Sequence, residues 1–526
     1  MKKTFLLLIS GLTFSMSYSQ EVSDAIRYAQ DNLTGTARFR AMGGAFGAVG
    51  GDFSSLSVNP AGSAIFSNNQ VGVTFSNQNI KNNSDYFDTQ TSDKKNSFIL
   101  NQAGAIFVFN DRNPNNNWKK IAIGATYETT NNFNNNVFSA GTNRYNSIDR
   151  YFLEYANKGN GGAPVPLEFV TLGPNGTITD LYAFLGSNLP SNQYKNLGGY
   201  SAQQALLGYE GLILNPEDET NPNSKYITNV PAQGNYLQEN NVNERGYNSK
   251  INFNIATSYK DRLYLGANLN VHVTDYRRSS SFYESNGNPL VPSETISNVT
   301  FNNELYTYGN GFSFQLGAIA KVTNAFRLGL AYESNTWYEL YDEITQSLYT
   351  TTENSAQQSF SNPVNPKITN VYDSYTLQTP GKFTFSAAYI FGKSGLISID
   401  YAVKDYSNTK FKTTSDYSFE VLNTEINNQL TNNGELRIGG EYKIKRVSLR
   451  GGYRYEESPY ENKTTIGDLK SYSGGLGYNL GGTKIDLAYS YTERKSSQGF
   501  FNVGLTDPAK IKSKLNNVSL TLLFEL

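Results

Sequence analysis

The side chains best suited to catalysis are scarce in this sequence. Its 526 residues include one histidine, His272, and no cysteine. A Ser-His-acid site needs the histidine beside a nucleophile, and no sequence signature marks such a nucleophile. The absence of cysteine excludes thiol chemistry, a disulfide framework and a lipid-anchored start. We therefore expect a protein that is not an enzyme and that uses no cofactor.

The acidic residues offer little more. The adjacent carboxylates Glu456-Glu457 and Asp342-Glu343 fall at the ends of predicted strands, where a solvated rim explains them better than an acid-base pair. No ligand spacing typical of a metal site is present. His272 stands between Val271 and Val273, so in a strand it faces the opposite side from these valines.

The composition favours a β structure. Charged residues make up only 17% of the chain, while there are 46 Gly, 38 Tyr and 31 Phe, a bias typical of strands and turns. Lys and Arg number 44 against 45 Asp and Glu, so there is no basic excess of the kind that binds nucleic acid.

The first residues have the pattern of an export signal. Lys2 and Lys3 precede an apolar run from Phe5 to Phe14, and Ser17-Tyr18-Ser19 offers the small residues that a signal peptidase reads. We expect a signal peptide over 1–19, cleaved near Ser19. Beyond it, no apolar run approaches the roughly 20 residues of a spanning helix. A membrane protein with this sequence must therefore be a closed barrel.

Period-two alternation of apolar and polar residues fills most of the chain after residue 70. It is clear in 71–75, 103–109, 121–127, 247–259, 263–273, 312–318, 326–332, 383–391 and 397–403, and around Ile438, Leu449, Leu476, Leu487 and Leu522. These segments predict an all-β fold, a 14-stranded antiparallel transmembrane β-barrel over 70–526. Short and long connections alternate along the chain, as in outer-membrane barrels and not as a soluble sandwich requires.

One connection is far longer than the others. The segment 131–244 is rich in Asn, Gly and Pro and lacks strand alternation, which predicts a long extracellular loop insertion. Two helices are expected within it, at 148–156 and 202–212.

A run of small residues precedes the first strand. Glycines stand at Gly43, Gly44, Gly47, Gly50 and Gly51, and the run closes with Asn59, Pro60, Ala61 and Gly62. This composition predicts compact, non-helical packing in a confined space. A flexible linker is the alternative, but it would not need the large apolar groups of Phe39, Phe46, Phe53 and Phe66. A short helix is expected over 22–32.

Together these features resemble the FadL/OmpP1/TodX family of outer-membrane transporters of hydrophobic compounds. The likeness rests on the exported start, the Asn59-Pro60-Ala61-Gly62 motif and about 14 strands. It also rests on short motifs in the predicted strands, such as Thr379-Pro380-Gly381-Lys382-Phe383 and Arg437-Ile438-Gly439-Gly440-Glu441-Tyr442. The resemblance implies that 20–69 folds back into the barrel as a hatch. It also implies that ligands are captured at the outer loops and leave sideways through the wall near a kinked strand.

The resemblance leads to a functional expectation. We expect passive transport of hydrophobic small molecules, similar to long-chain fatty acids, in the outer membrane of a double-membraned bacterium, with outer-membrane lipid as a further partner and no nucleic acid. Haem remains an alternative ligand, although His272 would then need a tyrosine as the second axial ligand. A second hypothesis is a barrel that serves as an interaction subunit and binds proteins through the 131–244 loop.

Two sets of residues are candidates for this function. The first comprises loop residues that could contact ligand or merely pack on each other: Tyr151, Phe152, Leu153, Leu206, Leu207 and Leu212. The second comprises hatch charges, Arg38, Arg40 and Asp52, which we expect to pair with lumen charges such as Asp275, Arg437 or Glu441, placed there by strand phase.

Overall fold

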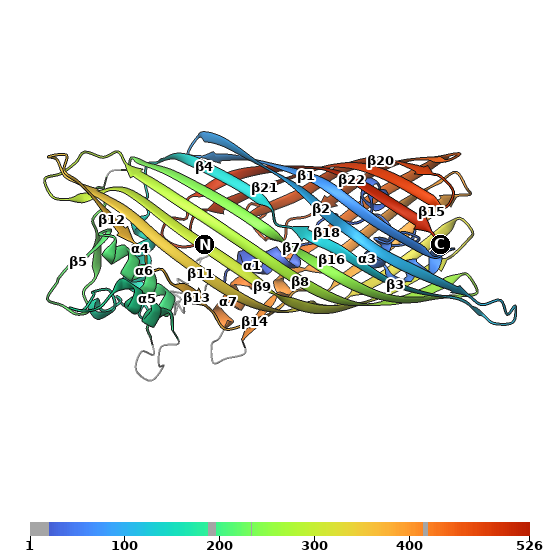
Figure 1. Ribbon diagram of the computed structural model, residues 1–526, viewed down its shortest axis with the longest axis horizontal. Coiled ribbons are helices and arrows are strands. Elements are labelled where there is room, and N and C mark those ends of the chain that lie inside the picture. Colours follow the sequence, from blue (N-terminus) through green and yellow to red (C-terminus); the bar gives the residue numbers. More distant parts are fainter. Residues whose placement is uncertain (1–19, 188–195, 233, 414–418) are drawn as a thin grey trace, which may run out of the picture.

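The computed structural model describes residues 20–187, 196–232, 234–413 and 419–526. The expected signal peptide at 1–19 lies outside the described residues. The chain forms a long closed cylinder of tilted strands, with helices inside it and at one end (Figure 1). The cylinder closes because β22 (Pro508–Glu525) pairs antiparallel with β1 (Gln70–Tyr86), from Gln70↔Glu525 to Asp85↔Lys510.

The other strands follow in chain order. They are β2 (Thr89–Asn110), β3 (Trp118–Asn132), β4 (Asn135–Asn143), β5 (Leu214–Pro216), β6 (Tyr226–Thr228), β7 (Tyr236–Tyr259), β8 (Leu263–Asn286), β9 (Thr295–Lys321), β10 (Phe326–Glu333), β11 (Trp337–Glu353), β12 (Ser359–Val364), β13 (Thr369–Val371), β14 (Tyr375–Gln378), β15 (Lys382–Phe391), β16 (Gly395–Asp405), β17 (Lys410–Thr413), β18 (Asn432–Ile444), β19 (Val447–Glu456), β20 (Ile466–Asn479) and β21 (Thr483–Gly499).

Several of these strands are consecutive pieces of one barrel strand. β4 continues β3, β11 continues β10, and β17 continues β16. β12, β13 and β14 each pair with β11, and β15 pairs with β10, so these four form one strand beside the β10–β11 strand. Counted in this way, the described residues form the predicted 14-stranded antiparallel barrel. Only the short hairpin of β5 and β6 stands outside the wall.

Strand alternation places apolar groups outside and polar groups inside. On β22, Leu520 and Phe524 are exposed, whereas Ser519 and Thr521 are buried. Exposed Leu, Ile, Val, Phe and Tyr side chains recur at the same phase on the neighbouring strands. This outer surface is the apolar belt that a lipid bilayer requires. No helix among the described residues is both long and apolar enough to cross a membrane.

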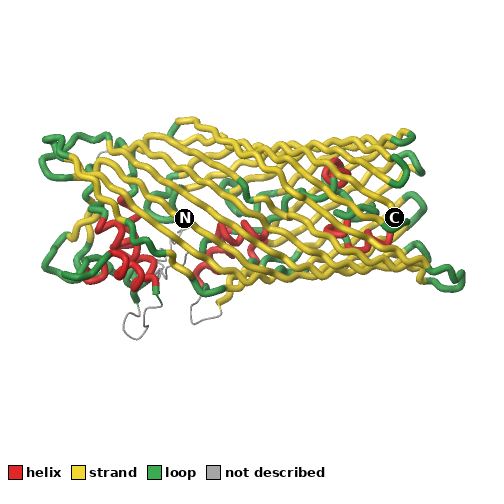
Figure 2. Tube along the Cα trace, viewed as in Figure 1, coloured by secondary structure: helices red, strands yellow, loops and turns green. Residues whose placement is uncertain are grey.

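Residues 20–69 lie inside the cylinder (Figure 2). We call this segment the hatch. It contains α1 (Val22–Ala29), α2 (Ala37–Ala41), α3 (Ser55–Val58) and a 3-10 helix, η1 (Pro60–Ile65), joined by tight turns. The helix expected at 22–32 is present but ends earlier, at Ala29. The prediction that the glycine-rich stretch is non-helical is wrong, because α2, α3 and η1 are short helices within it. The glycine run is almost wholly buried, which excludes the linker alternative.

The long connection is smaller than the sequence suggested. Strands β4 and β7 extend into the segment predicted as 131–244, so the loop proper is 144–235. Its helices are α4 (Asp149–Lys158), α5 (Ile178–Gly186) and α6 (Gly199–Glu210), with a 3-10 helix, η2 (Leu167–Phe169); α5 was not predicted. Two further helices lie near the end of this wall segment: η3 (Tyr406–Asn408) is between β16 and β17, and α7 (Glu420–Gln429) is between β17 and β18.

The loop 144–235 packs on the inner faces of the barrel strands where they rise above the belt. Its apolar core includes Phe282 of β8, Phe301 of β9 and Leu348 of β11. Since these barrel side chains face inward, the loop packs against the inside of the wall at this end of the cylinder instead of projecting freely into solvent.

Candidate functional site

The Asn59-Pro60-Ala61 corner of the hatch is seated on two glycines of the wall. The Asn59 side-chain amide donates hydrogen bonds to the carbonyl oxygens of Gly47 (2.8 Å) and of Ala318 in β9 (3.1 Å). A Cβ on Gly317 would lie 2.0 Å from Asn59 Oδ1, and one on Gly266 would lie 2.4 Å from the Pro60 carbonyl carbon. Only glycine on β8 and β9 therefore lets the corner approach the wall this closely.

A second contact holds the middle of the hatch. Asp400 Oδ2 on β16 accepts hydrogen bonds from the backbone N–H groups of Phe46 and Gly47, each at 2.9 Å. A Cβ on Gly47 would lie 2.0 Å from Ser386 Oγ on β15. The small residues of the hatch thus allow its backbone to bond directly to side chains of the wall.

The predicted charge pairing is confirmed at one position. Arg38 Nε donates to Glu441 Oε2 at 2.8 Å, and Glu441 also receives Arg450 Nε at 2.7 Å. The expected pairings of Arg40 and Asp52 with barrel charges are wrong. Arg40 reaches Ser490 Oγ at 3.4 Å, and Asp52 accepts from Thr36 Oγ1 within the hatch.

The other two charges expected in the lumen have different partners, and the lumen position predicted for Asp275 is wrong, because Asp275 shares the outward phase of β8 with Val271. Asp275 accepts from Tyr306 OH at 3.0 Å, and Arg437 pairs with Glu435 two residues away on its own strand. Strand alternation correctly predicted that Arg437 faces the inside of the barrel. It did not show that Glu435, on the same strand, would be the partner of Arg437.

The backbone ladder between β2 and β3 ends partway along the wall. These strands pair only from Asn110↔Lys120 to Gln102↔Glu128, whereas β2 continues to pair with β1 as far as Thr89. The register of β2 shifts at Asn101, just where its pairing with β3 ends. Beyond that point β4 pairs only with β7. We call this end of the β2–β3 ladder, and the unpaired wall above it, the wall split.

Side chains bridge the wall split where the backbone ladder is missing. Thr129 Oγ1 donates to the Leu100 carbonyl oxygen at 2.9 Å. Higher up, the hydroxyls of Ser84 on β1 and Ser139 on β4 form a hydrogen bond of 2.6 Å. A few side-chain bonds are easier to separate than a continuous backbone ladder.

The hatch is hydrogen-bonded to the last residues paired below the split. Glu128 Oε1 accepts from Thr34 Oγ1 at 2.9 Å, and Glu128 Oε2 accepts from Ser57 Oγ at 2.5 Å. Ser54 Oγ donates to Gln102 Oε1 at 2.8 Å. Both wall residues of the final β2–β3 pair therefore bind the hatch.

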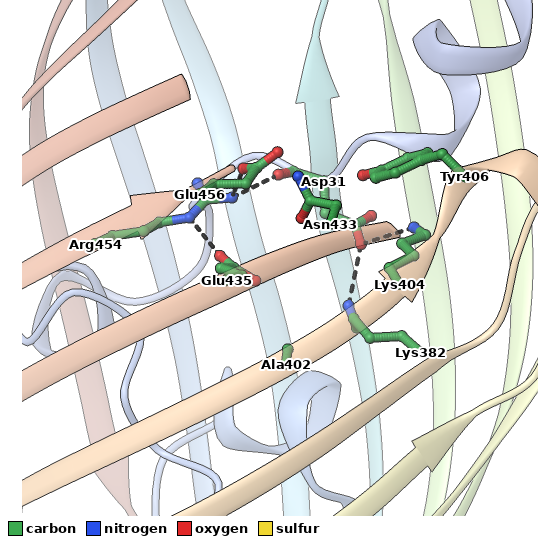
Figure 3. A pocket seen from close by; sticks show the side chains of 9 residues that line it. All are labelled: Asp31, Lys382, Ala402, Lys404, Tyr406, Asn433, Glu435, Arg454 and Glu456. Atoms are coloured by element: carbon green, nitrogen blue, oxygen red, sulfur yellow. Dashed lines mark hydrogen bonds and ion pairs between the residues drawn. The ribbon is translucent and has the colours of Figure 1, made fainter. Parts of the chain in front are cut away.

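Between the hatch and the barrel wall lies a network of charges (Figure 3). Asp31 of the hatch pairs with Lys382 of β15 (3.1 Å) and Lys404 of β16 (3.6 Å). Nearby, Arg454 bridges Glu435 and Glu456. The cavity that these residues line holds about 20 Å³, roughly enough for one water molecule. The side chains of the network thus leave only a small cavity between them.

An apolar cluster surrounds α1, next to the charge network. Val22, Ala25 and Ile26 of α1 pack with aromatic and aliphatic residues from the wall and from α7, namely Tyr338, Leu340, Tyr375, Leu377, Phe411, Phe419, Leu422 and Ile426. The hatch itself thus occupies the apolar space inside the barrel.

His272 faces the interior, as strand phase predicts. Its ring lies 2.9 Å from Ser313 Oγ and 3.3 Å from Tyr338 OH. Among the described residues, no group of three or more His, Cys, Asp or Glu side chains is placed to hold a metal ion.

The loop residues predicted to contact ligand lie mainly in the core of the loop. Tyr151, Phe152, Leu206 and Leu207 are buried there, and Leu153 packs against the same core. Leu212 is exposed and has a left-handed backbone, with a φ of 58°. The structure thus shows loop self-packing, and ligand contact at these positions stays a prediction.

Two features of the site were missed by sequence reasoning. The first is the pair Gly266 and Gly317, which face inward in strands with otherwise regular alternation. A glycine at such a position indicates that another segment of backbone comes close to the strand. Glu128 was a second signal, because an acidic residue at the end of an apolar strand needs a buried partner.

Comparison with known proteins gives the family. No curated protein matches the chain. Among solved structures, a Pseudomonas aeruginosa FadL homologue superimposes with a TM-score of 0.53 at 12% identity, covering 94% of this chain and 99% of that one. The Ralstonia pickettii toluene transporter TbuX gives a TM-score of 0.46 at 14% identity, and the Pseudomonas putida toluene transporter TodX gives 0.47 at 12%, each covering 94% of this chain and 99% of its own.

The likeness to the P. aeruginosa structure supports the barrel fold. The family model described as "Outer membrane protein transport protein (OMPP1/FadL/TodX)" matches residues 227–516, more than half of the 526 residues. The chain therefore belongs to the OMPP1/FadL/TodX family of outer membrane transport proteins.

Proposed function

We propose that this protein carries hydrophobic small molecules, similar to long-chain fatty acids, passively across the outer membrane. In this proposal the hatch is the gate and the wall split is the lateral exit. One observation carries the proposal: Glu128, at the last pair of the β2–β3 ladder, accepts hydrogen bonds from Thr34 and Ser57 of the hatch. A movement of the hatch would therefore act directly on the edge of the opening.

The apolar cluster around α1 supports this role. Val22, Ala25 and Ile26 fill a space lined by Tyr, Phe and Leu side chains, so an alkyl chain could replace them without exposing apolar surface to water. The ligand would then compete with α1 for one site. Displacement of α1 would pull on Asp31, which follows it and is held by Lys382 and Lys404.

A lateral exit suits an apolar cargo on physical grounds. The charge network borders the α1 cluster, and the rest of the hatch lies between α1 and the far end of the barrel (Figure 1). Moving an alkyl chain past these groups would bring it into contact with polar surface and water, which is unfavourable. A path through the wall split leads instead into the hydrocarbon of the bilayer.

The outer loop is the proposed entry. Tyr151, Phe152, Leu206 and Leu207, with Leu153 at their edge, form an apolar core that would become accessible if the loop 144–235 opened. Leu212 is already exposed. We propose that these side chains make the first contact with ligand when the loop lifts from Phe301 and Leu348.

Uptake of labelled oleate tests this function. The measurement compares a strain that lacks its own transporter, the same strain carrying this gene, and the strain carrying a variant with Val22, Ala25 and Ile26 all changed to Asp. We expect the gene to restore uptake and the variant to lose it, because three carboxylates cannot lie in the apolar cluster. Uptake that is unchanged by restoring the gene would overturn the proposal.

The alternative function is a scaffold that binds proteins through the 131–244 loop. It rests on exposed apolar side chains of that loop, notably Tyr145 and Ile227. Affinity purification in mild detergent separates the two functions. A stoichiometric protein lost in a Tyr145→Ser, Ile227→Ser variant favours the scaffold, whereas a co-purifying lipid retained in that variant favours transport.

A further inference from the structure

The outward-facing side chains of β2, β1, β22, β21 and β20 are arranged in rows across the strands. In the apolar belt, Leu520 of β22 pairs with Phe75 of β1 and with Leu487 of β21. Four residues towards the outer mouth, Asn516 pairs with Asn79 and Tyr491. This second row marks the edge of the belt, where amphipathic rings such as Tyr491 favour the interface.

The next rows are dominated by lysine. Lys514 of β22 pairs with Lys81 of β1, which pairs with Lys94 of β2. On the other side Lys514 pairs with Glu493 of β21, which pairs with Lys470 of β20. The rows above contain the pair Lys512↔Lys495 and then Lys510, opposite Asp85. We call these seven lysines the lysine rows.

Few acids balance this charge. Glu493, Asp85 and Asp468 also point outward in this region, so the patch contains seven lysines and three carboxylates. The one ion pair that the described residues form with a member of the lysine rows joins Lys512 Nζ to Glu493 Oε1 at 3.0 Å. The patch therefore carries a net positive charge with donors still available.

The opposite wall has no such excess. At the matching height on β7, β8, β9 and β11, outward positions are occupied by the acids Asp275, Glu304, Glu339 and Glu343 and by the bases Arg245 and Arg277. Arg277 is also engaged, with its guanidinium 3.8 Å from the ring centroid of Tyr306. The positive charge is thus a property of one side of the barrel.

The height of the lysine rows fits the headgroup region of the outer leaflet. A transmembrane β-strand needs about 9–11 tilted residues to cross the hydrocarbon. On β22 that length runs from the C-terminal end near Phe524 to about Asn516, and on β1 from Gln70 to about Asn79. Lys514 and Lys81 are the first charged outward residues beyond these limits, level with lipid headgroups.

We propose that the lysine rows bind the phosphate groups of a phosphorylated glycolipid in the outer leaflet. Ammonium groups spaced along adjacent strands suit a headgroup with several phosphates, while the apolar rows beneath them would contact its acyl chains. The bound lipid lies across the β1–β22 closure and reaches the free edge of β2. The inference does not rest on the proposed transport function.

Binding of fluorescent diphosphorylated lipid A to the full mature protein in neutral detergent tests the proposal. The test variant is Lys81→Gln, Lys512→Gln, Lys514→Gln, and the matched control is Arg245→Gln, Arg277→Gln on the opposite wall. Each lysine near a charged lipid surface contributes about a factor of five, so the test variant should bind roughly a hundredfold more weakly. The control should bind like the wild type.

Three further arms identify the ligand. Dephosphorylated lipid A should bind the wild type as weakly as diphosphorylated lipid A binds the test variant, and added NaCl should weaken wild-type binding. Inorganic phosphate at millimolar concentration should not displace the lipid, whereas full displacement would indicate a free-ion site and overturn the proposal. Equal losses in test and control variants, or equal affinity for dephosphorylated lipid, would also overturn it. If the triple variant fails to fold, Lys514→Gln alone serves, with a fivefold loss expected.

Discussion

Glu128 Oε1 of β3 lies 2.9 Å from Thr34 Oγ1 of the hatch. Its other oxygen, Oε2, accepts from Ser57 Oγ, so one wall carboxylate binds two separate turns of the hatch. Because Glu128 also ends the β2–β3 ladder, the position of the hatch and the continuity of the wall depend on the same residue.

Removing this carboxylate should loosen the closed state. In a Glu128→Ala variant, the hydroxyls of Thr34 and Ser57 lose their acceptor, at a cost of about 1–3 kcal/mol each. We expect a larger and noisier ion conductance in planar bilayers. Glu339→Ala, on the exposed outer face of β11, is the matched control and should conduct like the wild type. Equal conductance of all three proteins would contradict the role given to Glu128.

Reversing the charge of Arg38 should release the middle of the hatch. Glu441 is fully buried beside Arg38, so Arg38→Glu would place two carboxylates in contact and cost several kcal/mol. Since the chain has no cysteine, a spin label at an exposed Ser67→Cys reports hatch mobility without background. We expect a sharper spectrum in the variant. Lys393→Glu, in the turn between β15 and β16, is the control, and an unchanged spectrum in Arg38→Glu would refute the anchoring.

A methyl group on the wall should unseat the Asn59 corner. The Cβ introduced by Gly317→Ala would lie 2.0 Å from Asn59 Oδ1, whereas that of Gly451→Ala has nothing within 4 Å. We expect the first substitution to lower the temperature of the heat-induced gel shift by several degrees, as a loss of ~1–3 kcal/mol does, and the second to leave it unchanged. Similar shifts for both would show that the corner is not tightly seated.

The outer loop should become less stable as the pH rises. Burial raises the pKa of the Glu284 carboxyl to about 7 from 4.5, in the part of β8 that lies beyond the apolar belt and outside the membrane. Glu284 accepts from Ile148 N at 3.0 Å and from Gln238 Nε2 at 2.7 Å, which joins the loop to the wall. An acid with a raised pKa binds its proton more tightly in the folded state. Its contribution to stability is therefore full below about pH 4.5 and is lost as the pH rises through about 7.

Limited proteolysis of the loop, with a protease active over pH 5–8, measures this effect. Cleavage within 144–235 should accelerate with pH in the wild type more than in Glu284→Gln, which cannot ionise. Glu219→Gln, on the exposed surface of the same loop, controls for the pH response of the protease. Identical pH profiles of all three proteins would be evidence against a buried, ionising Glu284.

Much of the fold could be predicted from the sequence because membrane strands obey a local rule. Alternation placed Leu520 outside and Thr521 inside without knowledge of any neighbour, and the same rule turned His272 inward. The small residues of 43–51 indicated confinement, which their burial confirms.

The contacts of the site could not be predicted in the same way, because they join residues far apart in sequence. Asn59 meets Ala318, Phe46 meets Asp400, and nothing in local spacing selects these partners. The loop shows the same limit. The apolar faces of α4 and α6 indicated a surface to be covered, but the sequence could not tell whether ligand or Phe301 covers it.

Locking the wall split tests the central claim most directly. Ser84 Oγ on β1 and Ser139 Oγ on β4 lie 2.6 Å apart across the split, close enough for a disulfide after Ser84→Cys, Ser139→Cys. Ser76→Cys, Ser519→Cys is the matched control, because these hydroxyls also lie 2.6 Å apart but within the continuous β1–β22 ladder. We predict that oxidation abolishes oleate uptake through the first variant, that reduction restores it, and that the control transports under both conditions. Undiminished uptake through the oxidised Ser84–Ser139 variant would contradict lateral release through the wall split.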